Sequence, residues 1–130
     1  MAITSSPSTW ILDSGASNHM AAKKESFSSI EESIRPFILM GDDTPVEVYG
    51  KGIVSLEGGY FENVFHVPLF SINFLSIYKI THSGSGRKVE FYLDSLVISD
   101  LKTGSRVAHG VADHHVEEWR DFDGIIKLFL

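Results

Sequence analysis

The chain has 130 residues with a net charge of −6, and 43% of its residues are hydrophobic and 12% aromatic. These values are typical of one globular domain with its own core, and the acidic balance argues against a nucleic-acid-binding platform. The chain contains no cysteine, which excludes disulfides, cysteine nucleophiles and thiolate zinc sites and fits a reducing compartment.

Short apolar runs punctuated by glycine predict an all-β domain along most of the chain. Residues 1–8 form a loose polar leader without the pattern of a secretory signal, and no stretch reaches the ~18 apolar residues of a membrane span. A hairpin is expected around "GDDTP", which carries turn residues between two apolar runs. The expected strands cover residues 10–12, 37–40, 46–49, 52–56, 61–67, 88–94, 96–99 and 106–111.

Two segments have helical character. Residues 72–81 place Phe74, Ile77, Tyr78 and Thr81 on one helical face, and residues 20–25 contain good helix formers but are few. Toward the C-terminus, the polar composition of residues 112–123 indicates a surface connection. The apolar residues 124–130 would need a partner edge in this sheet or in another chain.

The stretch "TWILDSGASNHM" places one acid, Asp13, at the end of an apolar strand and follows it with small residues. Alone, this pattern is usually a turn or a helix cap. Small side chains, however, let a second backbone approach the acid. Two carboxylates about 3 Å apart share one proton, so that one activates water and the other protonates a carbonyl. The chain offers no good second copy, because "LDSL" has Leu96 where Gly15 stands, so a C2 homodimer would have to supply the second acid.

"WILDSGASNHM" resembles the start of the protease domain of copia-type retrotransposon polyproteins, a branch of the retropepsin-like aspartic proteases. "MGDDTPVEVYGKGIVSL" is similar to the flap segment of that family, and "FENVFHVPLFSINFLSIYKITHSG" and "VEFYLDSLVISDLKTG" resemble its later blocks. The resemblance implies an all-β, mostly antiparallel, partly closed β-barrel with one short helix, assembled as a C2 homodimer. It covers residues 9–111, between the flexible leader 1–8 and an atypical C-terminal segment, 112–130, interpreted as a linker plus an interface strand.

The resemblance also implies roles for matching residues. Asp13 would be the catalytic acid, Ser14 would brace the acid pair across the dimer axis, and Gly15 completes the motif. Leu75 and Ser76 would lie in a loop beneath the site. The substrate-binding residues would be those after the motif and those of the flap tip: Ala16, Ser17, Asn18, Met40, Gly41, Asp42, Asp43 and Thr44.

The implied activity is endopeptidase cleavage of a peptide or polyprotein by an activated water, without metal or cofactor. No direct nucleic-acid or membrane partner is expected, and the location would be the cytoplasm or virus-like particles. The competing hypothesis is a catalytically inactive domain that holds an extended peptide by β-augmentation or serves only for dimerisation. The atypical C-terminus and Ser76, in place of a common glycine, leave room for it.

Other candidate residues have simpler interpretations. His114 and His115, with the glutamates that follow, could be drawn as a metal site, but a solvated surface is the favoured interpretation. His19 could tune the proton affinity of the acids, although a hydrogen-bonded structural histidine is the commoner case. The phenylalanines could line substrate pockets, but we expect them in the core: Phe61, Phe65, Phe70 and Phe74.

Overall fold

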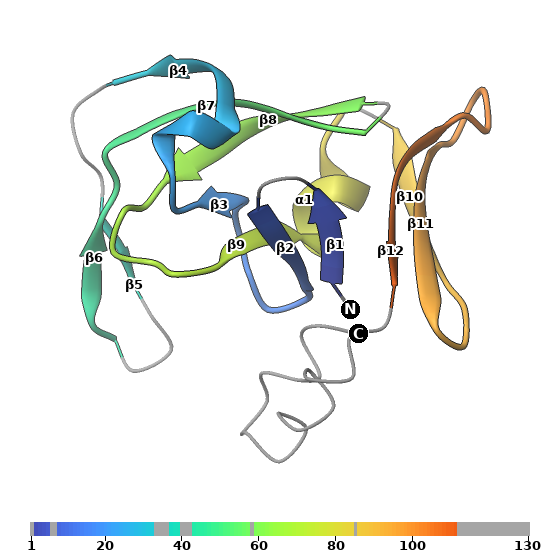
Figure 1. The fold of residues 1–130 in the computed structure, drawn as a ribbon, viewed down its shortest axis with the longest axis horizontal. Coiled ribbons are helices and arrows are strands. Elements are labelled where there is room, and N and C mark those ends of the chain that lie inside the picture. Colours follow the sequence, from blue (N-terminus) through green and yellow to red (C-terminus); the bar gives the residue numbers. More distant parts are fainter. Residues whose placement is uncertain are drawn as a thin grey trace.

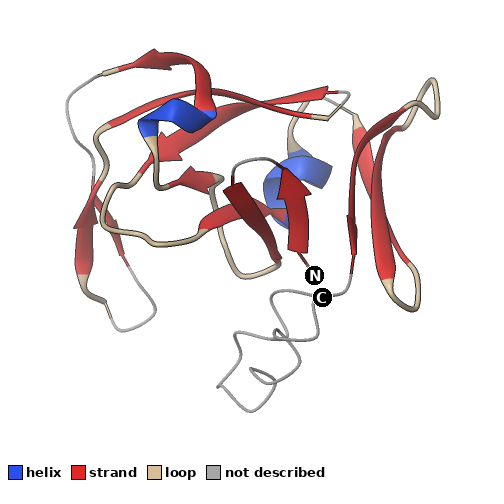
Figure 2. Ribbon diagram, in the orientation of Figure 1, coloured by secondary structure: helices blue, strands red, loops and turns tan. Residues whose placement is uncertain are grey.

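The computed structural model describes residues 2–5, 8–32, 37–39, 43–57, 59–84 and 86–111, and within them the chain is all-β with one short α-helix, α1 (Ile77–His82) (Figure 2). The strands are β1 (Ala2–Ser5), β2 (Ser8–Asp13), β3 (Met20–Ala21), β4 (Phe27–Glu31), β5 (Phe37–Leu39), β6 (Pro45–Glu47), β7 (Gly50–Leu56), β8 (Gly59–His66), β9 (Asn73–Ser76), β10 (Arg87–Phe91), β11 (Ser95–Asp100) and β12 (Arg106–Val111). No helix in this part of the chain is long and apolar enough to cross a membrane.

Ten strands form one sheet in the order β10-β11-β12-β1-β2-β9-β3-β8-β7-β4, and β5 and β6 form a separate hairpin. Most pairs are antiparallel, as the sequence predicts, while β2–β9 and β3–β8 are parallel. The sheet bends, but its end strands β10 and β4 stand at opposite sides of the molecule (Figure 1), so the sheet is open. The expected partial closure into a barrel is therefore not seen in the described strands.

The N-terminal segment, expected to be a loose leader, contains strand β1. It pairs along its length with β2, from Ala2 opposite Ile11 to Ser5 opposite Ser8, and its first residue also meets Val111 of β12. The expectation of a loose leader rested on the polar composition of this segment. It was wrong because strand pairing uses backbone groups and does not require apolar side chains. As a result, β1 joins the β10–β12 side of the sheet to β2.

The helix expected over residues 72–81 begins later than predicted. Residues Asn73–Ser76 form β9, because β2 and β3 lie on its two sides and provide backbone partners for an extended chain. The helix starts after Ser76, whose side-chain oxygen accepts a hydrogen bond from the Lys79 backbone N–H at 3.1 Å. Residues 20–25 divide in the same way, into β3 and a short 3-10 helix at Lys24–Ser26.

The main core lies between the bent sheet and α1. Trp10 and Leu12 of β2 pack there with Leu75 of β9, Phe61 of β8 and Ile80 of α1, all at most 2% exposed. This confirms the core interpretation for Phe61. A second, smaller cluster of Val46, Val48 and Val67 has Phe65 and Phe70 packed against it, and Phe74 makes an edge-to-face contact with Phe70.

The predictions for residues 112–130, including the histidine pair, lie outside the described residues, as do those for Met40, Gly41 and Asp42.

Candidate functional site

Asp13 ends the buried strand β2, as the sequence predicts. Strand β9 runs parallel beside it and places Ser76 opposite Asp13. The Asp13 side chain is 9% exposed, and its Oδ1 accepts hydrogen bonds from the backbone N–H groups of Gly15 at 2.7 Å and Ala16 at 3.1 Å. The acid therefore organises its own turn, so the turn interpretation and the catalytic interpretation of this motif are compatible.

The environment of Asp13 favours its neutral form. Burial raises the pKa of the carboxyl above its ordinary value of 3.8, and the hydrogen bonds from Gly15 and Ala16 offset part of this effect. A second carboxylate placed nearby would raise the proton affinity of the pair further, because two like charges resist close approach. Such an acid is suited to a pair that shares one proton.

Ser76 fixes the loop that follows Asp13, residues 14–19. Its hydroxyl donates to the Ala16 carbonyl oxygen at 2.6 Å, and its backbone N–H donates to Nδ1 of His19 at 2.9 Å. The family resemblance implies that Ser76 lies in a loop beneath the site, whereas in the structure it ends strand β9 and is fully buried. This role was not predicted from the sequence, although the position of Ser76 as the one serine inside the apolar run "FLSI" is a signal that could have identified it.

His19 is the hydrogen-bonded structural residue that was the favoured interpretation. It is 5% exposed, and its ring meets the Phe61 ring edge-on at 5.7 Å. Since Nδ1 accepts a backbone N–H, the ring is neutral with its proton on Nε2. Burial lowers the pKa of His19 from 6.5 to about 4, and the positive charges of Lys79 and Arg87 contribute to the lowering.

We expect the folded state to lose stability in mild acid because of His19. The unfolded chain takes up this proton near pH 6.5 and the folded chain near pH 4, so the unfolded state binds more protons between these values. The contribution of neutral His19 to the free energy of unfolding is fully present above pH 6.5 and is lost as the pH falls toward 4. The total loss is about 3 kcal/mol. Asp13, whose pKa is raised, contributes with the opposite sign.

Urea unfolding at pH 7.0 and 4.5 measures this loss, with His19→Asn as the control, because the amide of that variant can still accept a hydrogen bond but does not titrate. Equal pH dependence of the wild type and of this variant would contradict the assignment.

The other predicted site residues that the structure describes form two groups, one in the loop after Asp13 and one in the flap tip. Ser14, Gly15 and Ser17 are exposed beside Asp13, Asn18 is half-buried and donates to Ser17 Oγ at 3.1 Å, and Ala16 is buried. In the described part of the flap tip, Asp43 and Thr44 are exposed, and Asp43 has a positive φ of 64°. The β5–β6 hairpin stands apart from the end of β2 in Figure 1, so a single chain does not bring the two groups together.

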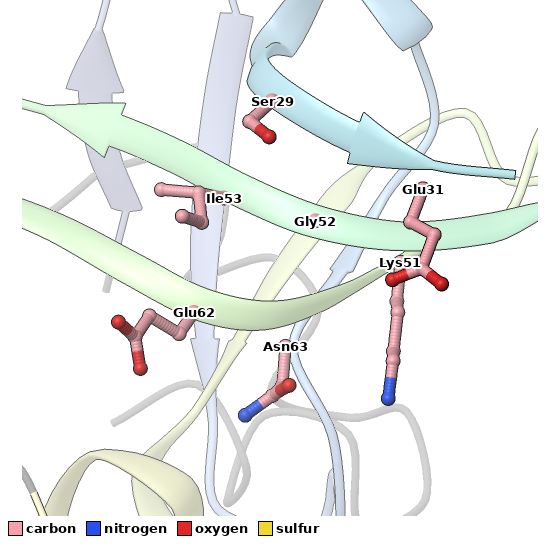
Figure 3. A pocket seen from close by; sticks show the side chains of 7 residues that line it. All are labelled: Ser29, Glu31, Lys51, Gly52, Ile53, Glu62 and Asn63. Carbon is pink, nitrogen blue, oxygen red and sulfur yellow. The ribbon is translucent and has the colours of Figure 1, made fainter.

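A hollow of about 230 Å³ lies elsewhere, over β4, β7 and β8 (Figure 3). Both neighbouring ladders shift register there, and Asn63 on its wall has a positive φ of 55°. None of the predicted site residues that the structure describes lines it. Within the described ranges, no group of three or more His, Asp or Glu side chains is arranged to hold a metal ion.

Residues 10–85, which contain both Asp13 and Ser76, match the sequence family described as the Pol polyprotein beta-barrel domain. The chain belongs to this family. The chain is 26% identical, over 88% of its length, to the retrovirus-related Pol polyprotein from transposon RE1 of Arabidopsis thaliana, and 25% identical, over 85% of its length, to that from transposon RE2 of the same plant. A putative transposon Ty5-1 protein of Saccharomyces cerevisiae is 30% identical over 54% of the chain and 48% of that protein.

These relatives connect the chain to retrotransposon Pol polyproteins. The chain spans only 8% of the length of the RE1 and RE2 polyproteins. No solved structure matches it significantly.

Proposed function

We propose that this chain is an aspartic endopeptidase of the retropepsin type, active as a C2 homodimer and acting on its own polyprotein. The observation that carries the proposal is the state of Asp13: a buried carboxyl with a raised pKa, held by two backbone N–H groups at the end of β2. A buried acid with a perturbed pKa is a candidate for acid–base chemistry. The resemblance of "WILDSGASNHM" to the protease motif supports the same conclusion.

The hydrogen bonds to Asp13 suggest which of its oxygen atoms would take part in acid–base catalysis. Both hydrogen bonds from the loop fall on Oδ1 of Asp13, so Oδ2 is the oxygen for the shared proton or the water. The ionised acid takes a proton from a water molecule while the oxygen of that water attacks the peptide carbonyl carbon. The protonated acid gives its proton to the carbonyl oxygen. When the C–N bond breaks, the leaving amine takes the proton that the first acid had accepted from water, and the second acid takes back a hydroxyl proton as the carbonyl of the new carboxyl group re-forms.

The remaining roles follow from position. Ser14 of each chain would brace the pair across the axis, beside Gly15, and an extended peptide would lie along Ala16, Ser17 and Asn18. The flap tip, Met40, Gly41, Asp42, Asp43 and Thr44, would close over the peptide. In Figure 1 the β5–β6 hairpin stands apart from the end of β2, so closure over a peptide would require the hairpin to move toward that end of β2.

Cleavage of an unfolded protein substrate, measured at mildly acidic pH over a range of chain concentrations, tests the proposal. We expect the activity per chain to rise with concentration until the dimer is fully formed, because half a site is inactive. Cleavage by a verified monomer would contradict the dimeric mechanism. No cleavage by a verified dimer would favour the inactive peptide-binding domain instead.

A further inference from the structure

One residue of β9 holds the Asp13 loop at two points. The Ser76 hydroxyl donates to the Ala16 carbonyl oxygen in the middle of the loop, and the Ser76 N–H donates to the His19 ring at the end of the loop. Ala16 in turn donates its own N–H to Asp13. A continuous chain of hydrogen bonds therefore links His19, through Ser76 and Ala16, to the carboxylate.

We propose that Ser76 and His19 form a clasp that positions the Asp13 loop, and that protonation of His19 opens it. The catalytic meaning of the clasp rests on the proposed function, whereas its structural action does not. Ser76 and His19 are positioning residues, since their contacts reach Asp13 only through Ala16.

The clasp is built on a rigid support. Ser76 lies in a strand that follows β2 residue by residue, from Trp10 opposite Asn73 to Asp13 opposite Ser76, and its hydroxyl also caps α1 by accepting the Lys79 N–H. Ser14, Gly15 and Ser17 of the loop are small and exposed, so their side chains contribute little packing that could fix the shape of the loop. Besides the clasp, the two hydrogen bonds to Oδ1 hold the turn, and the Phe65 N–H donates to the His19 carbonyl oxygen at the end of the loop at 2.8 Å.

Protonation removes the acceptor on which the clasp depends. An imidazolium donates from both nitrogens, so it cannot accept the Ser76 N–H. The charged groups that act on the ring are Lys79 of α1 and Arg87 of β10, both cationic, while β8 presents the Phe61 ring. Burial and both cations disfavour an imidazolium in this place, so the ring would leave it and the loop would be released in acid.

The test compares four variants with the wild type by amide exchange, and by cleavage of an unfolded protein. Ser76→Ala removes the hydroxyl, His19→Leu removes the acceptor, and His19→Asn keeps an acceptor that does not titrate. Ile80→Val is the matched control, because it loosens α1 by a buried methyl group without touching the loop.

We expect the protection factors of the Gly15 and Ala16 amides to fall roughly tenfold or more in Ser76→Ala and in His19→Leu. They should stay at the wild-type level in Ile80→Val and largely recover in His19→Asn. The cleavage rate should follow the same order, falling by about 10-fold to 100-fold where the loop is loosened, since misplacement of a reacting group is costly. His19→Asn should also retain its protection at acid pH, where the wild type loses it.

The outcomes separate the two proposals. Unchanged protection in Ser76→Ala and His19→Leu would overturn the clasp, whatever the activity. Protection that behaves as expected in a wild-type dimer that cleaves nothing would support the clasp and contradict the endopeptidase. If Ser76→Ala does not fold, the wild type still decides: protection of the Ser76 amide must fall in step with the titration of the His19 ring, and independence of the two would refute the clasp.

Discussion

Asp13→Asn is expected to abolish peptide cleavage, leaving a rate at least about 1,000-fold below that of the wild type. An asparagine offers the same oxygen to the N–H groups of Gly15 and Ala16, so the turn is retained. Its amide cannot exchange a proton at working pH, so the acid pair loses both its base and its acid. The measurement is the rate of cleavage of an unfolded protein at matched, dimer-forming concentrations.

Two controls make this result specific. Asp94→Asn changes an exposed aspartate in the similar context "LDSL" and should leave the rate unchanged. The stability of Asp13→Asn at neutral pH should equal or exceed that of the wild type, because a partly desolvated charge is removed. A rate in Asp13→Asn within tenfold of the wild-type rate would show that Asp13 is not the catalytic acid.

Gly52→Ala is expected to destabilise the domain by about 3 kcal/mol, the upper end of the usual cost of overpacking. A Cβ at residue 52 of β7 would lie 2.0 Å from the carbonyl oxygen of Ser29 and 2.8 Å from Cα of Ile30, both in the backbone of β4. Neither atom can move without displacing β4, which pairs with β7 on the edge of the sheet. Urea unfolding at neutral pH, where His19 is neutral in both the folded and the unfolded state, measures the change.

Gly84→Ala is the matched control for this substitution. A Cβ at Gly84 would meet nothing within 4 Å, and the backbone there has no positive φ. We therefore expect its stability to stay within about 0.5 kcal/mol of the wild-type value. Equal stability of Gly52→Ala and Gly84→Ala would mean that β4 does not lie against β7 as described.

The sequence by itself determined much of the strand pattern and the place of the acid. Alternation and turn residues predicted strands close to β7, β8, β10, β11 and β12, because side-chain periodicity and glycine punctuation are local properties of the chain. The order of an apolar run, one aspartate and small residues also located Asp13 at a strand end, since burial and the tight turn are both encoded within a short stretch of the chain.

Only the tertiary structure decided what surrounds that acid. The apolar spacing of residues 72–81 favoured a helix, but two flanking strands provided ladder partners and made Asn73–Ser76 a strand. Polar residues at the N-terminus became β1 for the same reason. Ser76 and His19 lie 57 residues apart in sequence. They form a hydrogen bond because β9 runs parallel to β2 and so places Ser76 beside the loop that contains His19. The local sequence pattern indicates which face of a segment is apolar. Backbone hydrogen-bond partners and buried polar contacts depend on residues that are distant in sequence, so the local pattern does not contain them.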